Sequence, residues 1–338
     1  MSYFLMLFLT ISLSVLGISH PSAAANSGAS APLKKDHLPA LSTETVNDAS
    51  LVTTVGPKTR GAAVLRAQIL LDRANFGPGE IDAVYGSTMR GAIVGYQASN
   101  GLDANGTIDE NTWATLNRDA EPALVTYTIT AKDVAGPFIP IPHDIMEKAK
   151  LPALGYASPA EALGEQFHVS PLLLQQLNPG KDFTAGQEIV VPNIGSPAPL
   201  PKLAKVVVDK SDSVVMLVDA EGKIIAQFPA TTGSKHDPLP IGAWKIQSVA
   251  INPVFHYNPD LFWDAKPVNE KAAIPAGPNN PVGVAWIDLS KEHYGIHGTP
   301  EPSKISKTES YGCVRLTNWN ALALAQVVKP GMPAILQK

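Results

Sequence analysis

Short apolar segments alternate with turn residues from residue 202 to residue 338. Each segment is rich in β-branched residues and only a few residues long, which is typical of strands in an all-β domain. The pattern predicts a mainly-β sandwich or barrel, with strands at 205–209, 213–219, 223–229, 244–248, 284–288 and 334–336. The turn at 219–222 (DAEG) predicts a hairpin, and 318–328 predicts a helix.

Helical spacing dominates earlier in the chain, over residues 61–118. Apolar residues within 64–74 recur at helical intervals, Thr88 is placed to cap a second helix, and Asp109 is placed to cap a third. We expect Tyr96 and Trp113 to be core aromatics of these helices. The segment therefore predicts a small three-helix domain.

Residues 124–193 combine the two periodicities. Alternation over 125–129 predicts a strand, and a β-branched run within 186–192 predicts another. Helical spacing lies between them, at 160–167 and 171–178. We expect a small α+β unit, interrupted after its first strand by a proline-rich stretch at about 132–155.

Two segments lack apolar periodicity. Residues 26–60 are rich in Ser, Ala and Thr and predict a flexible tether, and the proline-rich stretch 194–201 predicts a linker.

The N-terminus carries an apolar run from Phe4 to Ile18, followed by small residues up to Ala25. This predicts a secretory signal peptide over 1–25, because the run is short for a membrane span. No Lys or Arg precedes Lys34, so an uncleaved anchor remains the alternative. We expect an exported protein of the periplasm or cell-wall zone.

Composition narrows the function. A chain of 338 residues with 45% hydrophobic and 17% charged residues predicts two or three folded domains and excludes wholesale disorder. A net charge of −4 provides no basic surface for nucleic acid. The single cysteine, Cys313, excludes an internal disulfide. In an exported protein, an unpaired cysteine favours a reactive thiol.

The residues around Cys313 suit a nucleophile. A nucleophilic cysteine needs a base close by and room for a carbonyl to approach backbone N–H groups. His297, sixteen residues earlier, is the candidate base, and Gly312 is the small neighbour. The N–H groups of Gly312 and Cys313 can face a developing oxyanion. Arg315 is placed to favour the thiolate or to bind a substrate carboxylate.

The segments YGIHGT at 294–299 and SYGCVR at 310–315 resemble the signature of the L,D-transpeptidase (YkuD-type) catalytic domain. The phrases TTG, LPIG and NPVG at 231–233, 239–242 and 280–283 follow in the family's order. The resemblance implies this fold over 202–338 and catalytic roles for Cys313, His297, Gly298 and Gly312. It implies substrate binding by Arg315, Ser310, Tyr311, Tyr294 and Thr299, although Tyr311 stands where many members have His.

Both upstream units resemble wall-binding modules. Residues 88–97 and 101–106 resemble the peptidoglycan-binding three-helix domain, here 61–118. Residues 124–193 resemble a LysM module, with the inserted stretch in place of its G-D-T signature. The expected partners are peptidoglycan glycan and stem peptides, with envelope proteins as further candidates.

The resemblance implies a cysteine acyl transfer on peptidoglycan tetrapeptide stems. Cys313 would form a thioester with the third-position diamino acid, and a second stem's amine would resolve it into a cross-link. Water, a protein lysine or a free D-amino acid are alternative acceptors, which would give a carboxypeptidase or a protein-attaching enzyme. The family implies no metal or cofactor, and acylation of the same cysteine by carbapenems.

Two other classes of function remain. His293 and His297 are four residues apart, which on a helix would suit a zinc-dependent peptidoglycan hydrolase. A wall-binding protein that has lost catalysis is the third hypothesis, against which stands the presence of both His297 and Cys313. The donor groove is expected to be lined by Trp263, Trp286 and Tyr294, with core packing as the alternative for Trp286.

Overall fold

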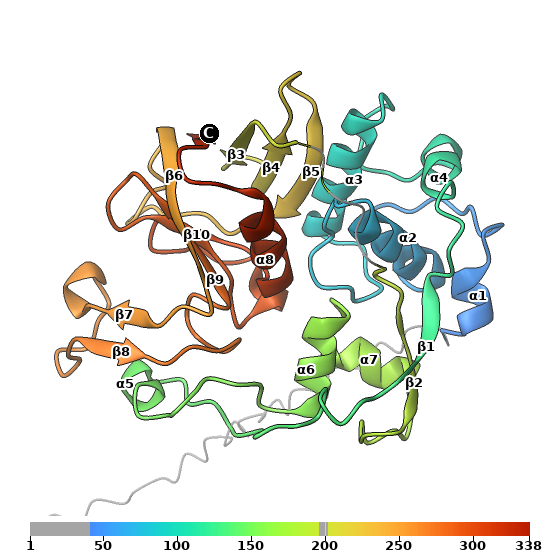
Figure 1. Cartoon of the computed structure of the whole chain (residues 1–338). Helices are drawn as coiled ribbons and strands as arrows, with labels where there is room; N and C mark the ends of the chain where they lie inside the picture. Colours follow the sequence, from blue (N-terminus) through green and yellow to red (C-terminus); the bar gives the residue numbers. More distant parts are fainter. Residues whose placement is uncertain (1–40, 196–199, 201) are drawn as a thin grey trace, which may run out of the picture. The chain divides into compact units, whose positions relative to one another are not determined.

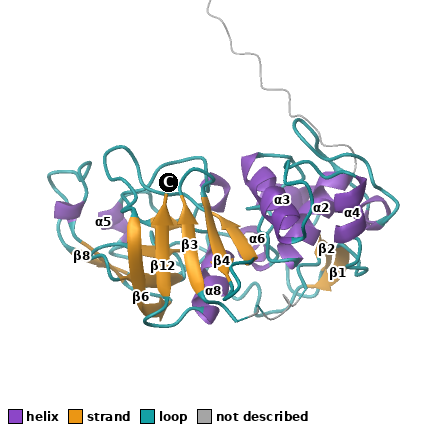
Figure 2. Ribbon diagram, turned by 90° about the horizontal axis from the view of Figure 1, so that it is seen from above, coloured by secondary structure: helices purple, strands orange, loops and turns teal. Residues whose placement is uncertain are grey.

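A sheet of eight strands in the order β11-β10-β9-β6-β12-β3-β4-β5 organises the C-terminal region of the computed structural model. Figure 2 shows β6, β12, β3 and β4 side by side. The strands are β3 Lys205–Asp209, β4 Val214–Val218, β5 Ile224–Pro229, β6 Gly242–Ile251, β9 Ala285–Leu289, β10 Gly295–His297, β11 Val314–Arg315 and β12 Pro333–Gln337.

The long strand β6 is the corner of this sheet. Its first residues, 242–245, pair with β12, whereas residues from Ile246 onward pair with β9, and the register shifts between Ile246 and Ser248. Such a bulge bends a strand and changes its direction. The mainly-β prediction is confirmed, and both sides of its core belong to one bent sheet.

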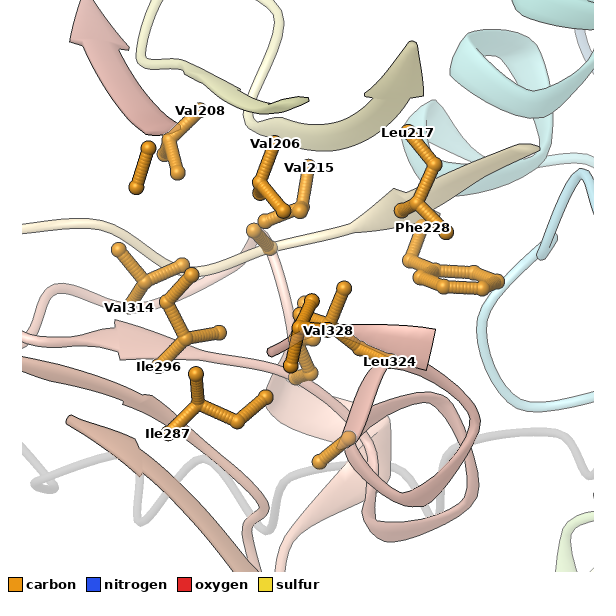
Figure 3. Close-up of a cluster of buried hydrophobic side chains, with 14 of the residues drawn as sticks. Val206, Val208, Val215, Leu217, Phe228, Ile287, Ile296, Val314, Leu324 and Val328 are labelled. Atoms are coloured by element: carbon orange, nitrogen blue, oxygen red, sulfur yellow. The ribbon is translucent and has the colours of Figure 1, made fainter. Parts of the chain in front are cut away.

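The core lies between the two parts of the sheet and is completed by helix α8, Asn318–Val327. Figure 3 shows side chains of β3 and β4 directed toward those of β9, β10 and α8. These side chains are almost wholly buried: Val206, Val208, Val215, Leu217, Ile287, Ile296, Val314 and Leu324.

Two pairs of very short strands escaped the sequence pattern. The strands β10 and β11 have only three and two residues, and β7 (Phe255–Tyr257) pairs with β8 (Ala272–Ile274) as a separate hairpin. The short helices η1, Pro259–Leu261, and η2, Pro302–Lys304, lie in the loops nearby. Segments this short have no measurable periodicity, so only their pairing reveals them.

Three helices form the earlier domain, namely α2 Ala62–Arg73, α3 Ser87–Ser99 and α4 Glu110–Leu116. Asp109 caps α4, since its Oδ1 accepts a hydrogen bond from Thr112 N at 2.8 Å. The predicted cap at Thr88 is wrong, because α3 begins at Ser87 after Gly86. Tyr96 and Trp113 are buried core aromatics, as expected.

The structure describes residues 41–195, 200 and 202–338. The expected signal peptide, residues 26–40 of the tether, and linker residues 196–199 and 201 lie outside that range. Within it, no helix combines the length and apolarity that crossing a membrane requires.

The tether prediction is wrong for residues 41–60. They include helix α1, Thr43–Asn47, whose Val46 is wholly buried. The Asn47 side chain makes two hydrogen bonds to the backbone of Leu124, at 2.7 and 2.9 Å. Val55 pairs with Ile108 of the three-helix domain. Isolated anchors of this kind leave no periodic signal in the sequence.

The α+β unit has the expected elements. Strands β1, Leu124–Thr128, and β2, Glu188–Pro192, pair antiparallel, and helices α6, Pro159–Gln166, and α7, Pro171–Leu177, lie between them in the chain. These elements agree with the strand-helix-helix-strand pattern, while membership of the LysM family stays a prediction.

The inserted stretch of this unit packs on the C-terminal region. It holds the short helix α5, Ile145–Lys148, and its Leu154 forms a small core with Tyr257 and Ile274 of the β7–β8 hairpin. Asp144, the cap of α5, forms an ion pair with Lys266 of the hairpin at 2.6 Å. The insertion therefore supports the hairpin.

The described domains lie within one compact unit, Leu38–Lys338, whose elements are shown in Figure 1. The three-helix domain covers β5, the edge strand of the sheet, where Gln227 Nε2 donates to Gly91 O and Gly77 N donates to Gln227 O, both at 2.8 Å. Covering an edge strand removes a site of unwanted strand pairing.

A partly buried carboxyl joins the α+β unit to the C-terminal region. Glu165 of α6 accepts a hydrogen bond from Asn318 Nδ2 of α8 at 3.1 Å. Burial is the main cause that raises the pKa of Glu165 to about 8; the hydrogen bond from Asn318 lowers this pKa, and the nearby carboxyls of Glu161 and Glu80 raise it. The group is therefore mostly neutral at pH 7 in the folded protein.

This raised pKa makes the protein less stable as the pH rises. Between its ordinary pKa of 4.5 and about 8, Glu165 ionises in the unfolded chain while it stays protonated in the folded one. Glu165→Gln removes this difference. We expect the melting temperature of Glu165→Gln to exceed that of wild type by a margin that grows from pH 5 to pH 8 and is then constant.

Differential scanning calorimetry across this pH range measures the margin. The exposed Glu188 provides a matched control for the exchange of a glutamate for a glutamine. A margin for Glu165→Gln that is independent of pH would contradict the assignment.

Candidate active site

His297 and Cys313 lie on neighbouring short strands. His297 ends β10, and Cys313 directly precedes β11, which pairs parallel to β10 with His297 opposite Arg315. His297 is buried and Cys313 is partly exposed. The two segments, sixteen residues apart in the sequence, are thus brought together by the sheet.

A backbone carbonyl orients the His297 ring. Nδ1 lies 2.7 Å from Gly298 O. A carbonyl can only accept, so Nδ1 carries the proton and Nε2 is left with its lone pair. The ring is therefore presented as a base through Nε2.

Trp286 packs on the same imidazole. The two rings stack with centroids 5.4 Å apart and planes 18° from parallel. A Cβ on Gly295 would lie 2.5 Å from the Trp286 ring, so glycine is needed there. Trp286 is partly exposed and is not among the core residues of the sheet, so its observed neighbour is the imidazole itself.

His297 and Cys313 are both neutral in the resting site. Burial lowers the pKa of His297 to about 3, with the positive charge of Arg315 as the second cause. Burial also raises the pKa of the Cys313 thiol, while the Gly295 backbone and Arg315 act in the opposite direction. The free protein therefore holds a thiol and a neutral imidazole, not an ion pair.

The thiol is directed toward a different acceptor from the one expected. Cys313 Sγ lies 3.7 Å from His293 O, and among the described residues it makes no hydrogen bond to the imidazole. Catalytic hydrogen bonds are often loose in unliganded sites and tighten when substrate binds.

Gly312 is required by its conformation and its surroundings. Its φ of 95° is one that L side chains rarely adopt, and an added Cβ would lie 2.5 Å from the Tyr294 ring. The N–H groups of Gly312 and Cys313 donate to no acceptor within the described chain. Two neighbouring unpaired donors next to a thiol form a candidate oxyanion hole.

Arg315 lies beside both groups and carries an unused charge. Its guanidinium forms no ion pair with a carboxylate of the described residues, and lies 6.0 Å from the centroid of Tyr311. Burial lowers its pKa. Such a cation can receive a carboxylate from a ligand.

Tyr311 is tied to the β7–β8 hairpin. Its hydroxyl donates to Asp264 Oδ2 at 2.5 Å, and its ring packs edge-on against Phe262, with centroids 5.0 Å apart. The pKa of Tyr311 is raised to about 12, with burial as the largest cause and the hydrogen bond to Asp264 as the second. Nothing in the pattern of the sequence pointed to Asp264, because its partner is 47 residues away.

The other expected binding residues have structural contacts. Ser310 Oγ donates to Cys313 O at 2.5 Å and closes the loop that leads to Cys313. Thr299 Oγ1 accepts from Glu301 N at 3.2 Å, and the Tyr294 ring lies over Gly312. Trp263 is 61% exposed and stacks on His236, and its ring centroid lies 6.4 Å from that of Tyr311.

The helical zinc motif lacks its helix. His293 lies in a turn at φ 66° and is exposed, while His297 is in strand β10. Within the residues described, no group of three His, Cys, Asp or Glu side chains is placed to hold a metal ion. The spacing that suggested zinc therefore has no structural counterpart.

Comparison with known proteins agrees with the two outer domains. A YkuD family model, for the L,D-transpeptidase catalytic domain, matches residues 204–336, and a peptidoglycan binding domain model matches 60–116. The chain is similar to a solved L,D-transpeptidase from Mycobacterium smegmatis (18% identity, 40% of this chain and 59% of that chain, TM-score 0.33). It also matches one from Xylanimonas cellulosilytica (13% identity, 84% and 97%, TM-score 0.35).

A relative in Bacillus licheniformis, named L,D-transpeptidase YkuD, is 30% identical over 174 residues, which cover 51% of this chain and 88% of that protein. The match spans most of the relative. Together with the matched catalytic-domain model, it shows that this chain belongs to the L,D-transpeptidase family.

Proposed function

We propose that the chain is a cysteine-dependent L,D-transpeptidase that acts on peptidoglycan tetrapeptide stems through an acyl-enzyme on Cys313. The observation that carries the proposal is the hydrogen bond from His297 Nδ1 to Gly298 O, which leaves Nε2 as a base beside the cysteine's strand. The unpaired N–H groups of Gly312 and Cys313 support it.

In the acylation step, the Cys313 thiol turns from His293 O toward His297 Nε2 and gives up its proton. The sulfur attacks the carbonyl that joins the third-position diamino acid to the terminal D-Ala. The N–H groups of Gly312 and Cys313 stabilise the oxyanion. D-Ala leaves with the proton from His297, and a thioester remains.

In the second step, an amine from another stem's diamino acid attacks the thioester. His297 takes a proton from the amine and returns one to the sulfur, so the enzyme is regenerated with a cross-link between two third positions. Water as acceptor would give an L,D-carboxypeptidase, and a protein lysine would attach that protein to the wall. Analysis of the reaction products identifies which of these acceptors the enzyme uses.

Arg315 is assigned to the donor stem. Its unpaired guanidinium suits a substrate carboxylate and also favours the thiolate. We place Tyr311 and Tyr294 at the walls of the donor site, while Ser310 and Thr299 hold the loops around it.

The upstream units are assigned to glycan. The domain over 60–116, which matches the peptidoglycan binding model, would bring the catalytic region to its polymeric substrate in the cell-wall or periplasmic zone. Export by the signal peptide expected at 1–25 belongs to the same proposal. The LysM-like unit is a weaker glycan candidate, because its insertion contacts the β7–β8 hairpin.

Intact mass spectrometry tests the acyl-enzyme directly. After incubation with a carbapenem or a tetrapeptide muropeptide, we expect a stoichiometric adduct on the wild type and none on Cys313→Ala. Added chelator should not change the result. A wild type without adduct, or activity that survives Cys313→Ala, would reject the cysteine mechanism.

The neutral resting state predicts how the thiol reacts with iodoacetamide. Because burial raises the Cys313 pKa above its ordinary 9.0, alkylation should accelerate about tenfold per pH unit from pH 6.5 to 8.5. Arg315→Gln removes a charge that lowers this pKa, so alkylation at pH 8 should slow by up to about tenfold.

The chain's only cysteine makes the mass readout unambiguous. Arg315→Lys keeps the charge and serves as the matched control, with a rate close to wild type. A rate that is flat between pH 6 and 8 would indicate a preformed thiolate and imidazolium, contrary to the electrostatics of the site.

A further inference from the structure

The side chain of Asn318 occupies a space that two glycines leave open. A Cβ added to Gly283 would lie 2.0 Å from Asn318 Oδ1, and a Cβ added to Gly298 would lie 2.2 Å from the same atom. Asn318 is 1% exposed. The amide therefore lies directly against the backbone of Gly298, whose carbonyl holds the catalytic imidazole.

The hydrogen bonds of Asn318 fix which way its amide points. Oδ1 accepts from Val284 N at 3.2 Å, and Nδ2 donates to Pro278 O at 3.1 Å. An N–H donor and a carbonyl acceptor leave one orientation of the amide. The oxygen must therefore be the atom between the two glycines.

The Gly298 peptide is held on its other sides as well. Its N–H donates to Ala285 O at 3.2 Å, and the preceding carbonyl, His297 O, accepts from Leu316 N at 2.8 Å. Asn318 closes the remaining side. A shift of Asn318 would let the Gly298 carbonyl rotate, which would weaken its hydrogen bond with the Nδ1 proton of His297.

The last contact of Asn318 comes from outside the catalytic domain. The second hydrogen of Nδ2 is directed to Glu165 Oε1 at 3.1 Å, from helix α6 of the α+β unit. The carboxyl of Glu165 has no other hydrogen bond within the described residues. Its neighbour in the helix, Glu161, bonds instead to Asn279 Nδ2 and Ala157 N, each at 2.7 Å.

We infer that Asn318 is a positioning residue that holds the Gly298 carbonyl against His297 Nδ1. Glu165 of the α+β unit keeps the Asn318 amide in this position by accepting a hydrogen bond from Nδ2. The accessory unit is then part of the catalytic apparatus, in addition to any role in binding glycan. The inference rests on the proposed function for its effect on rate, and on the structure alone for its effect on the imidazole.

The test uses the full chain labelled with ¹⁵N-histidine, with the His297 signals assigned by their loss in His297→Gln. In the wild type, Nδ1 should be protonated and Nε2 unprotonated. We expect Asn318→Ala and Glu165→Ala to mix the two tautomers and to speed exchange of the Nδ1 proton. Glu165→Gln, which keeps an acceptor for Nδ2, should restore the wild-type signals.

The rate of carbapenem acylation is measured on the same variants. Asn318→Ala should lower the maximal rate by about tenfold to a hundredfold, because a small misplacement of a catalytic group costs that much, and half-saturation should change little. Glu165→Ala should also lower the maximal rate, whereas Glu165→Gln should not. Glu161→Gln is the matched control from the same helix and should leave the tautomer unchanged.

Three results are distinguishable. Variants that lose thermal stability but keep wild-type His297 signals and acylation rates would overturn the inference and leave Asn318 a packing residue. A wild type that is never acylated would reject the proposed function, while the tautomer measurement would still test the inference. If Asn318→Ala does not fold, the comparison of Glu165→Ala with Glu165→Gln tests the inference by itself.

Discussion

The hydrogen bond from His297 Nδ1 to the Gly298 carbonyl is the contact on which the rest of the site depends. It assigns one proton to one nitrogen of a buried ring and so makes the other nitrogen a base. A carboxylate in this place would favour a charged imidazolium. A carbonyl orients the ring without adding a charge, which agrees with a site held neutral by burial.

A backbone acceptor can be adjusted only through the backbone. The sheet holds Gly298 by β10 and its neighbours, and two glycines admit the Asn318 amide against it. Trp286 fixes the plane of the ring from the other strand, β9. The orientation of one imidazole is thus distributed over three strands, one helix and a residue of the preceding unit.

The same packing explains why the upstream units are built into the molecule. Their residues cover the edge strand β5, support the β7–β8 hairpin through Asp144 and Leu154, and reach the core through Glu165. The inserted stretch that departs from the LysM pattern contacts the hairpin that carries Asp264, the partner of Tyr311. The upstream units and the catalytic domain therefore share one set of contacts.

The sequence by itself determined much of the local structure and chemistry. Periodicity located most strands and helices to within a few residues, and Asp109 marked a helix start, because these depend on neighbours in the chain. The motifs around His297 and Cys313 identified the candidate nucleophile, the base and the glycine, since such chemistry needs those residue types close together.

Only the tertiary structure decided which distant groups act on them. The two-residue strand β11, the stack of Trp286 on His297, the bond of Asp264 to Tyr311 and the Glu165–Asn318 contact each join segments that have no periodic relation. It also showed that residues 41–60 are anchored by single side chains such as Val46 and Asn47. Contacts between distant segments depend on how the whole chain packs, so no local pattern reports them.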